Sequence, residues 1–188
     1  MNWTVTMAFY IRKVKGSTDG GRHRNSPPDG GERMKLKEGM KAPGFELPDA
    51  RGKMHRLSDY AGKTVVLYFY PKDDTPGCTV EACEFRDAER HMASKGAAVI
   101  GVSPDGAGSH EKFAQKYALS FTLLSDPDHQ VAGKYRAWGK KNFMGREFDG
   151  LIRSTFVIGP DGNVKAAMYG VNPKGHAQEV LDKIGQRG

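Results

Sequence analysis

The sequence predicts a mixed α/β domain in which helices flank one central sheet. Residues 64–70 and 97–102 form two runs that are apolar at nearly every position, which is typical of strands buried on both faces. Helical patterns follow both runs, and strands that alternate with helices favour a parallel arrangement. Nearer the C-terminus, two more strand patterns flank the turn GPDG at residues 159–162, as in an antiparallel hairpin. The central sheet is therefore expected to be mixed.

The first predicted elements lie before the first apolar run. Residues 44–47 and 53–57 have the pattern of a β-hairpin around a turn that contains glycine. Ser58 is expected to cap a brief turn of helix before the strand at residues 64–70. After that strand, a helix is predicted from Cys78 to near Gly96, because apolar residues recur between charged ones and glycine commonly ends a helix.

The next elements continue the alternation of strand and helix. The strand at residues 97–102 precedes a helix over residues 110–117, which Ser109 is placed to cap. A short strand at residues 121–124 then precedes a helix over residues 129–135.

The C-terminal elements complete the sheet. A long loop is predicted at residues 137–150, followed by the two strands of the hairpin at residues 154–158 and 163–169. A helix over residues 177–184 closes the chain. This order of elements describes a thioredoxin-like fold with an added N-terminal β-hairpin.

Residues 1–33 differ in composition from the rest of the chain. Residues 16–33 are almost free of apolar side chains, so the first 33 residues are predicted to form a basic, disordered extension. Residues 34–188 are predicted to form one domain. The apolar residues near the N-terminus precede the basic ones, the reverse of a secretory signal, so a cytoplasmic protein is expected.

The net charge of the 188 residues is +7, which raises the question of a nucleic-acid partner. Residues 1–33 carry +3 of that charge, and the rest is spread among many acidic residues. No apolar run approaches the length that spans a bilayer. We therefore expect neither a nucleic-acid partner nor a membrane partner.

The two cysteines carry the chemistry that the sequence suggests. Cys78 follows Thr-Pro-Gly at the predicted start of a helix, in what is expected to be an exposed turn. Free N–H groups and the positive end of the helix dipole favour a thiolate there, so Cys78 is the candidate nucleophile. Cys83 could be a second reactive thiol or a small core residue.

The five-residue spacing limits how the two cysteines can interact. In an unbroken helix their Cα atoms would lie roughly 8.7 Å apart, beyond the reach of a disulfide. Pairing would therefore require the first turns of the helix to unwind. Zinc is not expected, because only His91 is near in sequence and no motif supplies further ligands.

Several separated motifs resemble those of the peroxiredoxins, and specifically the bacterioferritin-comigratory-protein or peroxiredoxin Q branch. The main one is Pro71-x-x-x-Thr75-x-x-Cys78 followed by TVEAC, which ends at Cys83. The others are MKAP at residues 40–43, FELP at 45–48, WGKKNFMGR at 138–146 and RSTFVI at 153–158. The resemblance extends from about residue 34 to the C-terminus.

The resemblance implies a role for each of five residues. Cys78 would be the peroxidatic thiol that attacks a hydroperoxide, and Cys83 the resolving thiol that forms a disulfide with it. The hydroxyl of Thr75, the backbone N–H of Cys78 and the guanidinium of Arg153 would stabilise charge on the peroxide oxygens. Pro71 would shield the sulfur from water. The resemblance further implies recycling by thioredoxin or a similar dithiol, a monomer, and no metal, haem or flavin cofactor.

Alternative interpretations remain for several residues. Thr75 could be only a turn or cap residue. Glu81 and Arg86 could support the site or form ordinary surface pairs on the helix. Three residues of the loop at 137–150 could pack it or line a cavity for organic peroxides: Trp138, Phe143 and Met144. Five histidines show no motif and are expected to be surface or core residues: His55, His91, His110, His129 and His176.

Two other classes of function are compatible with the sequence. A redox sensor or holdase would use the opened helix to bind a protein partner, with peroxide as the trigger only. A nucleic-acid-binding protein would use the basic residues of the first 33 positions. The peroxidase hypothesis is preferred because it accounts for both cysteines and all the separated motifs.

Overall fold

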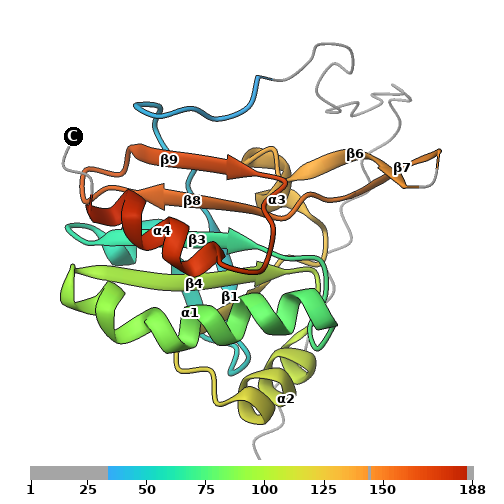
Figure 1. Cartoon of the computed structure of the whole chain (residues 1–188), viewed down its shortest axis with the longest axis horizontal. Helices are drawn as coiled ribbons and strands as arrows, with labels where there is room; N and C mark the ends of the chain where they lie inside the picture. The colour runs from blue at the N-terminus through green and yellow to red at the C-terminus, as the bar shows by residue number, and fades with distance from the viewer. Residues whose placement is uncertain (1–33, 144, 186–188) are drawn as a thin grey trace, which may run out of the picture. The chain divides into compact units, whose positions relative to one another are not determined.

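The computed structural model describes residues 34–143 and 145–185. Its centre is a five-stranded sheet with the strand order β5-β4-β3-β8-β9 (Figure 1). β3 pairs in parallel with β4, and β4 with β5, whereas β8 is antiparallel to both β3 and β9. The prediction of a mixed sheet is confirmed. The five strands are β3 (Thr64–Phe69), β4 (Ala97–Ser103), β5 (Thr122–Ser125), β8 (Ser154–Ile158) and β9 (Val164–Tyr169).

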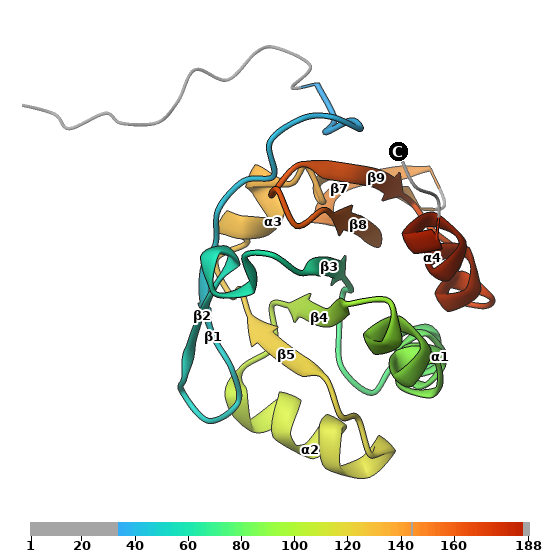
Figure 2. The same ribbon diagram turned by 90° about the vertical axis from the view of Figure 1, so that its left-hand side faces the viewer.

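Helices lie on both sides of the sheet. α1 and α4 cover one face, while α3 and the small hairpin of β1 and β2 lie on the other (Figure 2). α2 packs near β5 at the edge of the sheet. The expected N-terminal hairpin is present, since β1 pairs antiparallel with β2. The bounds are β1 (Glu46–Pro48), β2 (Met54–Arg56), α1 (Pro76–Ser94), α2 (Ala107–Tyr117), α3 (Gln130–Lys134) and α4 (His176–Gly185).

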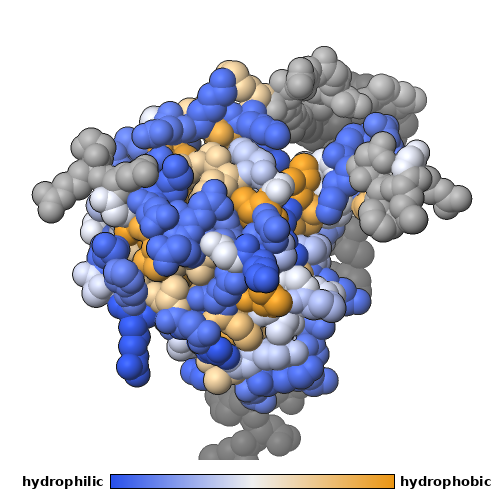
Figure 3. Space-filling model, in the orientation of Figure 1, coloured by the Kyte–Doolittle hydropathy of each residue, from blue (hydrophilic) through white to orange (hydrophobic). Residues whose placement is uncertain are grey.

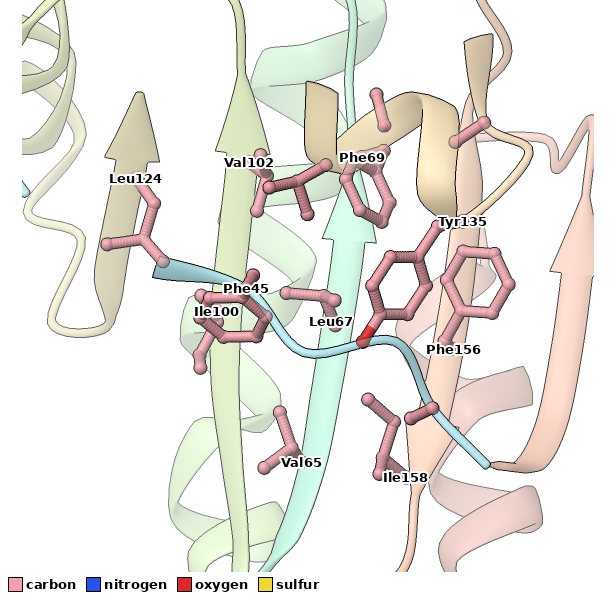
Figure 4. Close-up of a cluster of buried hydrophobic side chains, with 14 of the residues drawn as sticks. Phe45, Val65, Leu67, Phe69, Ile100, Val102, Leu124, Tyr135, Phe156 and Ile158 are labelled. Atoms are coloured by element: carbon pink, nitrogen blue, oxygen red, sulfur yellow. The ribbon is translucent and has the colours of Figure 1, made fainter. Parts of the chain in front are cut away.

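The central strand β3 explains why the chain has two hydrophobic cores. All six of its residues are buried, and successive side chains point to opposite faces of the sheet. Val65, Leu67 and Phe69 belong to the core beneath α3, which Figure 4 shows with side chains contributed by β4 and β8. Val66 and Tyr68 belong to the core beneath α1 and α4. The continuous apolar run predicted this strand, and the run is apolar because the strand is buried on both faces.

The segment at residues 137–150 differs from its prediction as a long loop. It forms an antiparallel ribbon of β6 (Trp138–Phe143) and β7 (Arg146–Leu151), paired from Trp138 with Leu151 to Phe143 with Arg146. Backbone hydrogen bonds hold this ribbon, so it needs little of the alternation between apolar and polar residues by which a half-buried strand is recognised.

Two predicted helix caps are also wrong. Ser109 lies inside α2, because its N–H already donates to the carbonyl of Gly106, which is the N-cap residue. Ser58 lies inside a short 3₁₀ helix, η1 (Leu57–Tyr60), whose N-cap is Arg56. In both places the helix begins earlier in the sequence than the first strong capping residue.

Hydrophilic and hydrophobic side chains are interspersed on the face that carries α1 and α4 (Figure 3). None of the helices in the described part of the chain is both long enough and apolar enough to span a membrane. The predicted extension at residues 1–33 lies outside the described residues.

Candidate active site

The candidate site forms where β3 ends and α1 begins. Pro71 follows the strand, and the chain reaches the helix through a short loop in which Asp74 adopts a left-handed backbone conformation with φ of 54°. Thr75 is the N-cap residue, and Pro76 occupies the first turn of α1, where its fixed φ suits the helix and its missing N–H is not needed. The carbonyl of Thr75 accepts from the N–H of Thr79 at 2.8 Å. Cys78 therefore lies in the first turn, where backbone N–H groups have no intrahelical partner.

Cys78 is buried, which corrects the expectation of an exposed turn. Only 1% of its surface is accessible, because α1 presses this side of its first turn onto the sheet. Arg153 contacts it from the other side of the site, and its Nη2 donates to the Cys78 Sγ at 3.1 Å. A cationic donor at this distance stabilises negative charge on the sulfur.

The sheet topology brings Arg153 to this position. It immediately precedes β8, which runs antiparallel to β3, and Ser154 at the start of β8 pairs with Phe69 at the end of β3. The beginning of β8 and the carboxyl end of β3 therefore lie at the same edge of the sheet. The predicted proximity of Arg153 to the thiol is present in the structure.

Glu81 is a third member of the cluster, and the sequence left its place open. It is fully buried, and its Oε2 forms an ion pair with Nη1 of Arg153, so the guanidinium bridges Glu81 and Cys78. The other oxygen, Oε1, has no hydrogen-bond partner within the described part of the chain. The sequence feature that could have pointed to Glu81 is its spacing, because a residue three positions after Cys78 lies on the same face of a helix.

Burial governs the electrostatics of this pair. It raises the pKa of Glu81 to about 7, although the charge of Arg153 and its hydrogen bond act in the opposite direction. Burial alone would lower the pKa of Arg153, but the charge of Glu81 and the hydrogen bond to Cys78 raise it. The arginine thus stays positively charged, while Glu81 can change its charge near neutral pH.

Thr75 and Pro71 lie next to the cluster without a described contact to the sulfur. The Thr75 hydroxyl donates to the carbonyl of Lys72 at 3.1 Å, and its side chain does not cap the helix. Pro71 is exposed. Arg86, the other residue left open, is bound to Asp87 and to the carbonyl of Tyr117, on the side of α1 that faces α2.

Cys83 lies on the same helix as Cys78, and both are free thiols. α1 is continuous from Pro76 to Ser94, so the two sulfurs are held apart as the spacing predicts. Cys83 is partly exposed, in contrast to Cys78. The described structure is thus that of the dithiol form.

The remaining expectations concern metal ligands and the aromatic and methionine residues of the segment at 137–150. Among the described residues, no group of three or more His, Cys, Asp or Glu side chains is arranged to hold a metal ion. Trp138 stacks on His129 with ring centroids 3.6 Å apart, which gives it a packing role. Met144 and the side chain of Phe143 lie outside what the structure describes.

The fold and the cluster together define a class of protein. A thioredoxin-like sheet presents a buried cysteine at a helix start, against an arginine, together with a second thiol on the same helix. These are the features of a thiol-based oxidoreductase. The chain matches the model of the AhpC/TSA family over residues 39–167 and belongs to that family.

Comparison with individual proteins shows to which branch of this family the chain is similar. The chain is 45% identical to Peroxiredoxin Bcp of Bacillus subtilis over 151 residues, which cover 80% of this chain and 96% of that protein. A mutant of the Xylella fastidiosa PrxQ superposes with a TM-score of 0.74 at 35% identity, covering 82% of this chain and 97% of that one. The bacterioferritin comigratory protein of Xanthomonas campestris superposes with a TM-score of 0.71 at 36% identity, covering 74% and 89%.

The chain is therefore a peroxiredoxin of the bacterioferritin-comigratory-protein and peroxiredoxin Q branch, as its motifs suggested. Members of this family are thiol-dependent peroxidases, so the chain is an oxidoreductase with two cysteines.

Proposed function

We propose that the protein reduces hydrogen peroxide and organic hydroperoxides with Cys78 as the peroxidatic thiol. The observation that carries this proposal is the 3.1 Å contact between Arg153 and the sulfur of a buried cysteine at a helix start. Cys83 also lies beside a cation, Arg86 of the same helix, but it is partly exposed and is not at the helix start. Support for organic substrates comes from the Xanthomonas campestris relative, whose structure is described in terms of alkyl peroxide reduction activity.

In the first step the Cys78 thiolate attacks one oxygen of the hydroperoxide. A sulfur–oxygen bond forms, the oxygen–oxygen bond breaks, and the leaving oxygen takes a proton to become water or an alcohol. The enzyme is left with a sulfenic acid. Negative charge moves from sulfur to oxygen during this step, so donors that are already in place lower the barrier. Arg153 and the free backbone N–H of Cys78 are two such donors.

Thr75 and Pro71 complete the proposed site. A hydroxyl has one donor hydrogen and two acceptor lone pairs, so the Thr75 hydroxyl can turn from the Lys72 carbonyl toward a bound peroxide. Pro71 offers no N–H and only apolar ring atoms at the mouth of the site, where it would limit the access of water to the sulfur.

In the second step the Cys83 thiol condenses with the sulfenic acid, which releases water and forms the Cys78–Cys83 disulfide. The first turns of α1 must unwind for this step. We expect the unwinding to end shortly after Cys83, because the side chain of Phe85 is fully buried in the core. Its ring centroid lies 4.8 Å from that of Tyr68. The carboxylate of Glu84 also holds this part of α1 in place, because it accepts a hydrogen bond from the N–H of Gly175 at 2.9 Å.

The third step returns the enzyme to its dithiol form. Thioredoxin or a similar dithiol would attack the disulfide, pass through a mixed disulfide and leave oxidised. We further propose that the protein works as a cytoplasmic monomer, with no nucleic-acid or membrane partner. The chemistry of these steps is carried by the two thiols and requires no metal or organic cofactor.

Cysteine variants test the assignment. Cys78→Ser should lose peroxide consumption, whereas Cys83→Ser should still be oxidised once, to a product that is one oxygen heavier by intact mass spectrometry. Val80→Ala, at an exposed position on the same helix, is the matched control and should behave like the unchanged protein. Thiol-dependent turnover by Cys78→Ser would show that the assignment is wrong.

A turnover assay separates the enzyme from a redox sensor. Thioredoxin with its reductase and NADPH should support many rounds of peroxide reduction per molecule of protein, and glutaredoxin serves as a comparison reductant. A reaction that stops after one equivalent of peroxide with every dithiol would contradict the proposed cycle.

A further inference from the structure

A second buried polar cluster lies beneath the loop that leads into α1. Asp73 is 6% exposed, Tyr70 is 1% exposed and His110 of α2 is fully buried. The Asp73 carboxylate accepts from the Tyr70 hydroxyl at 2.6 Å through Oδ1, and its Oδ2 lies 2.8 Å from Nδ1 of His110. A buried carboxylate is costly unless it is paired and hydrogen-bonded, and this one is bound through both oxygens.

The charge state of Asp73 agrees with these contacts. Burial alone would raise its pKa, but the hydrogen bonds from His110, Tyr70 and Ser109 act together against burial, and the pKa is lowered. The carboxylate is therefore ionised at neutral pH and accepts from these donors. Nδ1 of His110 is therefore the donor to this carboxylate.

The backbone of Asp73 is fixed as well. Its N–H donates to Oδ2 of Asp105 at 2.7 Å, and Ser103 at the end of β4 holds that same oxygen at 3.1 Å. The loop is thus attached to α2 through His110 and to the end of β4 through Asp105. None of these bonds involves residues 76–83.

The position of this attachment matters for the proposed cycle. Asp73 lies two residues before Thr75, the N-cap residue of α1, and five before Cys78. Phe85 and Glu84 fix the helix after Cys83. The segment that must unwind is therefore bounded by fixed points on both sides. Shifting a reacting group by about 1 Å can cost on the order of 100-fold in rate, so a fixed start of the helix has kinetic value.

We propose that Asp73 and His110 are positioning residues for Cys78, which hold the start of α1 in place while the first turns of the helix unwind and re-form. This inference rests on the proposed function of Cys78 and Cys83. The anchor keeps Thr75 and the first N–H groups of the helix aligned for attack on peroxide. It also gives the helix the same starting point after each reduction.

Two variants at one position provide the test. In His110→Asn the amide nitrogen takes nearly the position of the imidazole Nδ1 and can still donate to Asp73, whereas His110→Leu removes the donor. Rapid-quench mass spectrometry measures the rate of Cys78 oxidation separately from the rate of disulfide formation. His110→Leu should slow Cys78 oxidation by about tenfold without slowing disulfide formation to the same extent, and His110→Asn should recover most of the rate.

A control for stability accompanies these variants. Val131→Ala, in the core on the opposite face of the sheet, lowers stability without touching the cluster and should leave the oxidation rate unchanged. If His110→Leu oxidises at the normal rate, or if it slows both steps equally and Val131→Ala does the same, the positioning role is wrong. Failure of the unchanged protein to form the disulfide would instead contradict the proposed function.

A second measurement needs no variant and covers the case in which His110→Leu does not fold. Amide hydrogen exchange of the unchanged protein is compared between the dithiol and disulfide forms. The Asp73 amide should stay protected in both forms, while amides at residues 79–83 lose protection on oxidation. Loss of protection at Asp73 in the disulfide form would overturn the proposal.

Discussion

The buried Glu81 carboxylate predicts a specific dependence of stability on pH. Its pKa is about 7 in the folded protein, against 4.5 for an ordinary glutamate. The folded state therefore holds this proton more tightly than the unfolded state does. The resulting stabilisation is complete below about pH 4.5 and is lost as the pH rises through about 7.

The size of the effect follows from the difference between the two pKa values. About 2.5 pH units correspond to roughly 3 kcal/mol, of which some 2.5 kcal/mol is lost between about pH 5 and about pH 8. Glu81→Gln removes this titration but keeps the shape of the side chain. Relative to its parent, the variant should therefore gain about 2.5 kcal/mol in its free energy of unfolding over that interval.

The assay is urea unfolding of both proteins at the two pH values, in a background of Cys78→Ser and Cys83→Ser. That background removes both thiols, and neither is among the causes of the Glu81 shift. Other titrating groups are common to both proteins and cancel in the difference between them. The variant can lose a constant amount from its altered contact with Arg153, so only the change with pH is diagnostic. An equal difference at both pH values would refute the reasoning.

Three further substitutions test other parts of the structure. Arg153→Lys keeps the charge but cannot donate to the sulfur and to Glu81 as a fork, so peroxide reduction should slow by about 100-fold in initial-rate assays; an unchanged rate would contradict the role of the guanidinium. Gly101→Ala would place a Cβ 2.8 Å from the Tyr68 ring, and denaturant unfolding should show a loss of about 1–3 kcal/mol rather than none. Phe85→Ala should cost about 3–5 kcal/mol by the same measurement, and a loss as small as that of an exposed residue would rule out its role as the fixed point of α1.

Local patterns were sufficient for most of the secondary structure. The strand at β3 and the helix that ends before Gly96 were predictable because burial on both faces, helical periodicity and glycine act over a few neighbouring residues. The ribbon of β6 and β7 was missed because its pairing depends on backbone hydrogen bonds between two segments. A polar segment carries little side-chain signal for that pairing.

Some residues of the candidate site could likewise be identified from local sequence patterns, whereas others depend on tertiary packing. Cys78 and Cys83 could be identified from their place after an apolar strand and from their spacing along a helix. The full burial of Glu81 could not, because it depends on the packing of α1 against the sheet and on an arginine 72 residues away. The same holds for His110, whose partner Asp73 lies 37 residues away in the sequence.

The sequence by itself determined the order of the elements of the central sheet and its helices, the family and the two thiols, since these depend on short motifs and local periodicity. Only the tertiary structure decided that Cys78 is buried and that one arginine bridges it to a buried glutamate. It also decided that the loop before α1 is fixed to α2. The physical reason is that these contacts join segments far apart in the chain. Their distances are set by the strand order of the sheet and the packing of helices upon it.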